Sequence, residues 1–183
     1  VVSPDDLVRD YGCDSLRMYE LFVGPPELDA EWDDRGIDGV YRFLNRVWNL
    51  VMDSKDADVK ATKEMIKIRN KMVYDITTRL ESFSLNTVIS GFMEYNNKLI
   101  DIAKKEGGID KETLSTFAVL LAPFAPHMAE ELWQQLGHEG TVFNAGWPTY
   151  DEDAMKDDEI EVAVQINGKT RAVVTVPADV SKE

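Results

Sequence analysis

Apolar residues recur at helical spacing through most of the first 136 positions of the chain. Three long stripes with the i, i+3, i+4, i+7 pattern of amphipathic helices predict helices over about 37–51, 65–83 and 85–103. Shorter helices are predicted over 110–122 and 126–136, and glycines follow the ends of several of these segments. Because long helices joined by short connectors favour antiparallel neighbours, the pattern predicts a helical bundle.

Two short helices are predicted before the bundle. Ser3 can cap the first, which should end near Gly12. We expect Asp14 to cap a second helix over 15–23. Residues 27–36 then form a polar connector to the first long helix.

The character of the chain changes after residue 148. Residues 149–158 are acidic and rich in turn formers, whereas 159–166 and 169–176 alternate between polar and apolar side chains. The alternation predicts a β-hairpin, and a three-residue turn over 167–169, with Gly168 in a left-handed bulge position, keeps one face apolar. The pairs expected from this turn are Ile166 with Thr170, Val164 with Ala172, Val162 with Val174, and Ile160 with Val176.

Composition narrows the class of protein. The chain is 44% hydrophobic, enough for a packed core, but no apolar run reaches the roughly 18 residues that a membrane helix needs. Cys13 is the single cysteine, so an internal disulfide and a Cys-rich zinc site are excluded and a cytoplasmic setting is favoured. The chain starts at Val1 without a signal peptide, which suggests a fragment of a longer protein.

The net charge of −14 argues at first against nucleic acid, which selects basic surfaces. The charge is distributed unevenly, because residues 1–34, 35–105 and 106–183 carry net charges of −8, +4 and −10. Because the middle of the chain is mildly positive between two acidic flanks, the charge distribution is compatible with binding of a polyanionic ligand. The alternative is ordinary variation between solvated helix faces.

The segment LAPFAPHMAEELW at 121–133 is the most specific motif. Pro126 suits the first position of a helix, and Glu130 and Glu131 follow it near the positive end of the helix dipole. The segment resembles the anticodon-binding helical bundle of class Ia aminoacyl-tRNA synthetases. Residues 1–25 resemble the part of those enzymes that follows the KMSKS loop.

Two further segments are similar to the leucyl members. AEWDDRGIDGVYRFLNRVWNLV at 30–51 resembles the entry to their bundle, and VQINGKTRAVVTVPAD at 164–179 resembles the first hairpin of the bacterial C-terminal domain. The chain is therefore identified as a fragment of the leucyl-tRNA synthetase family. The equivalent bundle of an isoleucyl, valyl or methionyl enzyme is the first alternative, and a helical protein-interaction scaffold is the second.

The resemblance implies a mainly α fold in four parts. These are a stem-contact region over 1–34, an anticodon-binding-like bundle over 35–148, a linker over 149–158 and a truncated C-terminal α+β domain from 159 to 183. The parent enzyme would ligate leucine to tRNA(Leu) with ATP and Mg in catalytic and editing domains that this chain lacks. The fragment alone is expected to be inactive, without a cofactor, membrane or disulfide partner, and to position tRNA in the cytoplasm.

The best candidates for tRNA contact lie on the polar face of the first bundle helix. Arg42, Asn45, Arg46 and Asn49 have i, i+3, i+4, i+7 spacing, and no acidic residue occurs from 39 to 52. Arginine binds phosphate oxygens bidentately, so a stripe of donors without nearby carboxylates suits an RNA backbone. The alternative is that these arginines pair with acidic residues elsewhere in the bundle.

Lys169 and Arg171 are further candidates, because the resemblance implies that the C-terminal domain reaches the tRNA elbow, although a lysine at a hairpin tip also serves solubility. Arg35 is a weaker candidate, and the nearby Trp32 fits packing against the bundle better than base stacking. Five lysines alternate with acidic residues and are interpreted as a solvated helix face. They are Lys55, Lys60, Lys63, Lys67 and Lys71.

No catalytic or metal site is predicted. The only two histidines, His127 and His138, lie in contexts unlike a HIGH motif or a zinc site, and no nucleophile motif such as GxSxG occurs. We expect His127 to cap or pack at its helix start. Trp48 and Trp133 are interpreted as core anchors.

Overall fold

The structure is a computed structural model that describes residues 3–25, 28–29, 31–33, 35–156, 159–166 and 169–177, with backbone alone for the last two ranges. The chain divides into two compact units, Val1–Tyr150 and Asp151–Glu183, which we describe separately.

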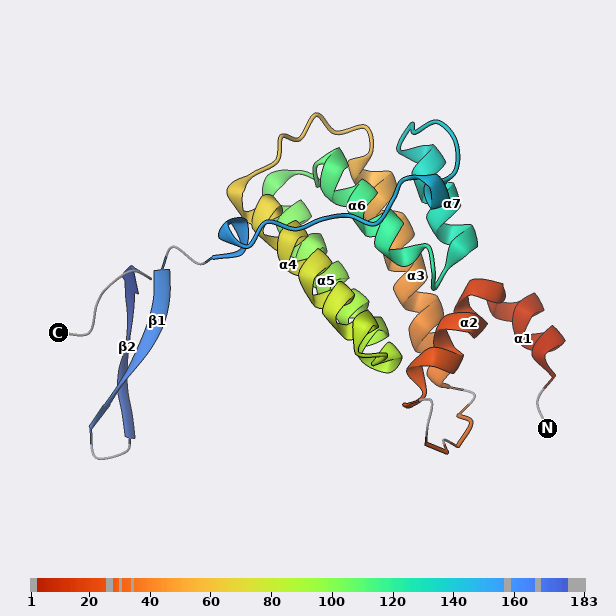
Figure 1. The fold of residues 1–183 in the computed structure, drawn as a ribbon, viewed down its shortest axis with the longest axis horizontal. Helices are drawn as coiled ribbons and strands as arrows, with labels where there is room; N and C mark the ends of the chain where they lie inside the picture. The colour runs from red at the N-terminus through yellow and green to blue at the C-terminus, as the bar shows by residue number, and fades with distance from the viewer. Residues whose placement is uncertain are drawn as a thin grey trace. The chain divides into compact units, whose positions relative to one another are not determined.

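The described part of the first unit contains seven α-helices (Figure 1). The long helices α4 and α5 lie side by side as an antiparallel pair, and α3 packs against α5. None of the described helices is long and apolar enough to cross a membrane. The helices are α1 (Pro4–Tyr11), α2 (Cys13–Phe22), α3 (Gly36–Ser54), α4 (Lys63–Glu81), α5 (Leu85–Glu106), α6 (Lys111–Leu121) and α7 (Pro126–Gln135).

The bundle core is built by the apolar stripes seen in the sequence. Ile37, Val40 and Val47 of α3 are fully buried, as periodic apolar positions on one helix face should be. At the centre, the ring of Phe92 in α5 lies 5.8 Å from that of Phe117 and 5.5 Å from that of Phe124. These aromatic contacts join α5 to α6 and to the turn before α7.

The structure corrects the prediction that Asp14 caps the second helix. Asp14 lies within the first turn of α2 rather than capping that helix, and its carboxylate is buried. The oxygen Oδ2 accepts the backbone N–H of Met128 at 2.7 Å, and Oδ1 lies 2.8 Å from Nδ1 of His127. Asp14 thus links α2 to the start of α7, 114 residues away in the chain. His127 lies at the start of α7, but its side chain is 76% exposed, so the expected capping or packing is limited to its contact with Asp14.

A second contact holds the connector before α3. The hydroxyl of Tyr19 in α2 donates to the carbonyl of Asp33 at 2.6 Å. Gly36, the first residue of α3, lies against the Tyr19 ring so closely that a Cβ there would overlap it. The ring of Trp32 contacts the ring of Tyr19 edge to face, with 4.9 Å between the two ring centroids.

Helix α4 ends in a tight turn whose conformation normally selects glycine. Phe83 has φ 56°, the left-handed region, and it is 63% exposed. The backbone N–H of Phe83 donates to the backbone carbonyl of Leu80, and the N–H of Ser84 donates to the backbone carbonyl of Arg79. This is the hydrogen-bond pattern of a Schellman C-cap, with Phe where glycine is usual.

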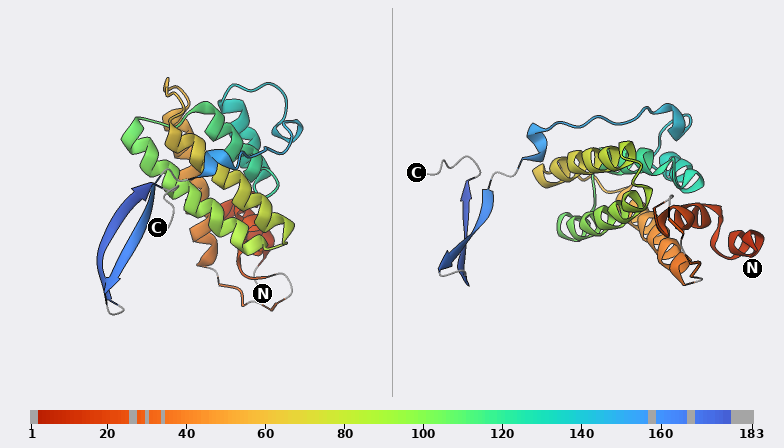
Figure 2. Two further views of the ribbon diagram at one scale, coloured as in Figure 1. Left: turned by 60° about the vertical axis from the view of Figure 1, so that its left-hand side comes forward. Right: turned by 60° about the horizontal axis from the view of Figure 1, so that its bottom comes forward.

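The segment from 141 to 150, here called the strap, follows α7 and passes over α4 (Figure 2). Glu130 of α7 accepts the hydroxyl of Thr141 at 2.8 Å and the N–H of Val142 at 3.0 Å, and these bonds lower the pKa of Glu130. Further along, Nε1 of Trp147 donates to the Thr77 hydroxyl at 2.9 Å. At its end, Tyr150 contacts Tyr74 of α4 edge to face.

Trp48 and Trp133 are half-buried rather than central in the core. The ring of Trp133 stacks on that of His138 at 3.8 Å and an interplanar angle of 15°. Both tryptophans pack against the core as predicted, but they are only partly buried, as is usual for a side chain as large as tryptophan.

The second unit contains the 3-10 helix η2 (Asp153–Met155) and the strands β1 (Glu159–Ile166) and β2 (Lys169–Pro177), which pair antiparallel. Three predicted pairs are present: Ile160 with Val176, Val162 with Val174, and Val164 with Ala172. The fourth is wrong, because Thr170 pairs with Gln165 and Lys169 pairs with Ile166. A bulge after Val164 shifts the register, so Lys169 belongs to the strand; Gly168 lies outside the described residues.

Candidate nucleic-acid interface

The polar stripe predicted on the first bundle helix is an exposed face of α3. Arg42, Asn45, Arg46 and Asn49 are all exposed, while the apolar residues between them point into the core. This follows from 3.6-residue periodicity, since positions i, i+3, i+4 and i+7 share one face. The helix therefore presents two guanidinium and two amide groups to solvent.

Among the described residues, the hydrogen bonds of these donors stay within α3. Nε of Arg42 donates to the carbonyl of Asp38 at 3.2 Å, and Nδ2 of Asn45 donates to the carbonyl of Tyr41 at 3.0 Å. Within the described part of the chain, no carboxylate oxygen lies within 4.0 Å of the guanidinium of Arg42 or Arg46. The alternative, pairing with acidic residues elsewhere in the bundle, is thus not seen among the described residues.

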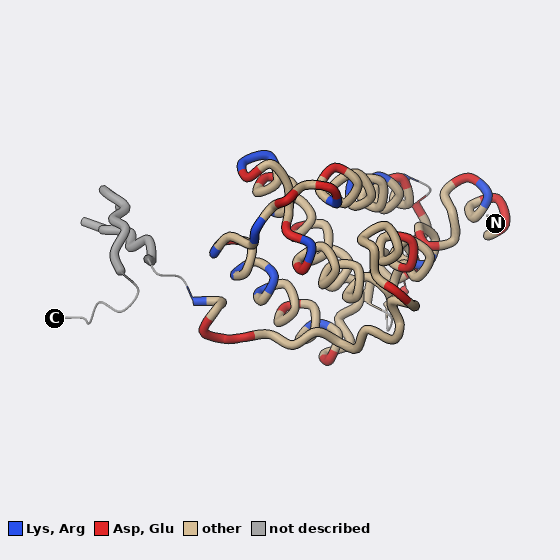
Figure 3. The backbone as a smooth tube through the Cα atoms, turned by 90° about the horizontal axis from the view of Figure 1, so that it is seen from above, with Lys and Arg blue, Asp and Glu red and all other residues tan. Residues whose placement is uncertain are grey.

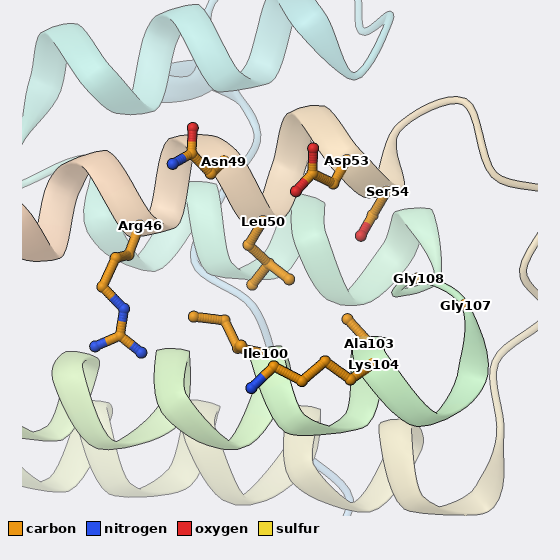
Figure 4. A pocket seen from close by; sticks show the side chains of 10 residues that line it. All are labelled: Arg46, Asn49, Leu50, Asp53, Ser54, Ile100, Ala103, Lys104, Gly107 and Gly108. Atoms are coloured by element: carbon orange, nitrogen blue, oxygen red, sulfur yellow. The ribbon is translucent and has the colours of Figure 1, made fainter.

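Arg46 and Asn49 border a groove of about 310 Å³ between α3 and α5. Figure 4 shows Arg46 extending from α3 towards α5. The side chain of Lys104 lies along α5 and points towards Arg46. Leu50 and Ile100 form the apolar floor between the two helices. The groove therefore brings a cation from each helix to one opening.

Lys104 was missed by sequence reasoning. It lies 58 residues from Arg46 and shares no helix face with it, so only packing of α5 against α3 brings the two together. Its Nζ is 3.2 Å from a carboxylate oxygen of Asp101, and Asp53 lines the same groove. The cationic character of the groove is therefore moderate.

Asn45 belongs to a different groove, of about 400 Å³, which α3 shares with α1, α2 and α7. Tyr11, Tyr41 and His127 line this second groove, and the rings of Tyr11 and Tyr41 contact edge to face at 5.7 Å. Three residues of the predicted stripe therefore line two different grooves, whereas Arg42 lines neither of them.

The remaining candidates differ in their surroundings. Arg35 is exposed just before α3, but its Nε lies 3.4 Å from a carboxylate oxygen of Asp33. The backbone N–H of Arg35 also donates to that carboxylate, which lowers the pKa of Asp33. Lys169 and Arg171 lie in β2, whose side chains are outside the described part.

Charged residues are interspersed over the bundle rather than gathered in one patch (Figure 3). Among the described residues, no group of three or more His, Cys, Asp or Glu side chains is arranged to hold a metal ion. What the surface offers is hydrogen-bond donors and cations at the mouths of shallow grooves. Hydrogen-bond donors and cations are the groups that phosphate oxygens need as partners.

Comparisons with known proteins show the family to which the chain is similar. A family model described as the anticodon-binding domain of tRNA ligase matches residues 62–183. Leucine–tRNA ligases of Fervidobacterium nodosum and Thermosipho melanesiensis are 46% and 42% identical to the chain over its whole length. The chain covers 24% of the length of each of these two proteins.

A solved structure is also similar along the whole chain. It is the ternary complex of Agrobacterium radiobacter K84 agnB2 LeuRS with tRNA and LeuAMS, with a TM-score of 0.82 and 28% sequence identity. The match covers 100% of this chain and 25% of the other. In both comparisons the chain corresponds to about a quarter of a much longer protein.

Proposed function

The chain belongs to the family of anticodon-binding domains of tRNA ligases, and we propose that it is the tRNA-binding part of a leucyl-tRNA ligase. In this role the exposed face of α3 contacts the phosphate backbone of tRNA(Leu). Leucine, ATP and Mg are used by catalytic parts of the same ligase that lie outside this chain.

The observation that carries the proposal is the pair of arginines on α3. Arg42 and Arg46 are exposed, and no described carboxylate pairs with them, although the chain has a net charge of −14. An exposed guanidinium without an internal partner is ready to bind a phosphate bidentately. Contacts of this kind position a nucleic acid without reading its bases.

The parts of the chain have separate roles in this proposal. Residues 1–34 connect the bundle to the catalytic part, and residues 35–148 form the tRNA-binding bundle. Residues 149–158 are a linker to an α+β domain whose first strands are β1 and β2, and there Lys169 and Arg171 contact the tRNA elbow. The single cysteine fits action in the cytoplasm.

The test uses the full-length ligase with Arg46→Glu. Replacing an attraction to phosphate by a repulsion changes the interaction by about 2 kcal/mol at 4 Å in water, or about 30-fold in Kd before salt screening. At moderate salt we expect the Kd for tRNA(Leu) to rise about tenfold, while leucine-dependent ATP–pyrophosphate exchange is unchanged. The Tm should shift by less than about 2 °C, because Arg46 is exposed.

Lys60→Glu is the matched control, because Lys60 is exposed, lines neither of the two grooves described and undergoes the same change of charge. Equal affinities of the two variants would remove Arg46 from the interface. Binding through two to four phosphates gives a slope of about −1.5 to −3.5 for log affinity against log salt. Absence of tRNA binding by the parent protein would favour the protein-interaction scaffold instead.

A further inference from the structure

The groove between α3 and α5 has unpaired polar groups of both charges on its α3 wall. Within the part of the chain that the structure describes, four polar side chains of this wall make neither a hydrogen bond nor an ion pair. They are Arg46, Asn49, Asp53 and Ser54. Asn45, one turn further back on the same helix, does find a partner, since it donates to a backbone carbonyl. The α3 wall therefore offers a cation, an amide, a carboxylate and a hydroxyl to a ligand.

The hydroxyl of Ser54 faces the groove from inside the protein. Ser54 is 2% exposed, and Figure 4 shows its side chain pointing from α3 towards the end of α5. Gly107 and Gly108 line the groove at this end without a side chain that could pair with the hydroxyl. Because a buried hydroxyl is normally hydrogen-bonded, the unpaired Ser54 marks this end of the groove as a place for a polar ligand group.

The two unpaired charges of the wall are too far apart to neutralise each other. Arg46 and Asp53 are seven residues apart on α3, about 10.5 Å along the helix axis. Asn49 lies between them, about 4.5 Å from Arg46 along the same axis. On the facing helix, Lys104 pairs with Asp101 at 3.2 Å. The wall is therefore a row of cation, amide and anion, and a ligand that satisfies it carries an anion and a cation at a similar separation.

A short peptide carries these groups in the matching order. Three extended residues span at most about 10–11 Å, with a carboxylate at one end, an ammonium at the other and amide groups between them. Arg46 can bind the carboxylate bidentately, and the Asn49 amide can both donate to and accept from a peptide group. The carboxylate of Asp53 and the hydroxyl of Ser54 can accept from the ammonium. A free amino acid is too short, because its two charged groups flank a single carbon atom.

The floor of the groove suits an apolar side chain in the middle of such a peptide. Leu50 of α3 is 5% exposed, and Ile100 and Ala103 of α5 are partly buried against the core. The volume of about 310 Å³ lies at the lower end of the range of about 300–1,000 Å³ found for ligand pockets. The groove therefore has room for a few residues and not for a folded partner.

We propose that the α3–α5 groove binds a short zwitterionic peptide of about three residues with an apolar central side chain. The carboxylate of the peptide lies at Arg46, and its ammonium lies at Asp53 and Ser54. This site is independent of the proposed function, although Arg46 also belongs to the face that contacts tRNA there. Asp53 distinguishes the two ligands, because a carboxylate attracts the ammonium of a peptide and repels the phosphates of an RNA.

The experiment titrates the peptide Ala-Val-Ala into the full-length ligase without tRNA and measures the heat of binding. We expect a Kd on the order of 0.1–1 mM, since the ligand is small and the groove is open. Asp53→Asn and Arg46→Gln should each raise Kd at least fivefold, because each removes one charged partner and keeps a similar shape. N-acetyl-Ala-Val-Ala-amide, which lacks both charges, should bind at least tenfold more weakly.

Asp38→Asn is the matched control, because Asp38 is an exposed acid of the same helix and lines neither of the two grooves described. It should leave Kd unchanged. Peptide bound at another site of the ligase would be equally unaffected by Asp53→Asn, so only a difference between these two variants reports the groove. The Tm values of the variants should agree within about 2 °C, because the replaced residues are exposed.

Three results would overturn the proposal: no binding of Ala-Val-Ala, equal binding of the capped peptide, or a Kd for Asp53→Asn equal to that of Asp38→Asn. The affinity for tRNA(Leu) should not fall in Asp53→Asn, since the substitution removes a negative charge. A fall would show that Asp53 acts on the helix itself, which also refutes its role in binding. If the peptide binds as expected and tRNA(Leu) does not bind, the proposed function fails and the peptide site stands.

Discussion

Asp14→Ala tests whether one buried carboxylate holds the N-terminal helices on the bundle. Asp14 is 8% exposed, accepts the N–H of Met128 at 2.7 Å and contacts His127 at 2.8 Å. A hydrogen bond to a charged group contributes about 1.5–3 kcal/mol, and the charge also lies in the first turn of α2 and at the start of α7. The contact to His127 adds little, because that side chain is 76% exposed.

We therefore expect Asp14→Ala to lower the free energy of unfolding by about 2–3 kcal/mol. For a chain of 183 residues this lowers Tm by about 5–10 °C. Asp14→Asn should cost less, since an amide oxygen still accepts one hydrogen bond but carries no charge. His127→Ala should cost less than about 0.5 kcal/mol.

Urea denaturation of the 183-residue chain, followed by circular dichroism, gives these free energies. Asp38→Ala is the matched control, because Asp38 is an exposed acid in the first turn of α3 without a long-range partner among the described residues. It should cost under about 1 kcal/mol. The reasoning is refuted if Asp14→Ala costs no more than this control, or if His127→Ala costs as much as Asp14→Ala.

Three further substitutions test local features of the fold. Phe83→Gly should raise the free energy of unfolding by about 0.5–1 kcal/mol in urea, because glycine adopts φ 56° without strain and the exposed ring buries little; a loss of stability would contradict this. Gly36→Ala should lower it by about 1–3 kcal/mol in the same assay, because the new Cβ overlaps Tyr19, and a neutral result would show that the ring moves freely. Burial, together with the charge of Lys111, lowers the pKa of His138 below its ordinary value of 6.5. The unfolded chain then binds the proton first, so stability present above pH 6.5 is lost as the pH falls towards the lower folded-state value. His138→Gln should remove that part of the pH dependence, and unchanged curves would refute it.

The sequence by itself determined the helices. Apolar periodicity follows from the 3.6-residue repeat of a helix, and end signals are equally local, so together they place every helix of the bundle within a few positions of its observed bounds. The same periodicity placed Arg42 and Arg46 on one exposed face. The resemblance carried by 121–133 and 164–179 identified the family that the comparisons then showed.

Only the tertiary structure decided which distant groups meet. A capping residue predicted for α2 serves α7 instead, because Asp14 is oriented by the packing of two helices that periodicity cannot relate. The register next to the hairpin turn was also decided by the structure: Ile166 pairs with Lys169, and the bulge after Val164 restores the apolar pairs that the sequence predicted with a longer turn. Helix packing likewise placed Lys104 in the same groove as Arg46. Local patterns specify the faces of helices, whereas the pairing of faces depends on how the whole core packs.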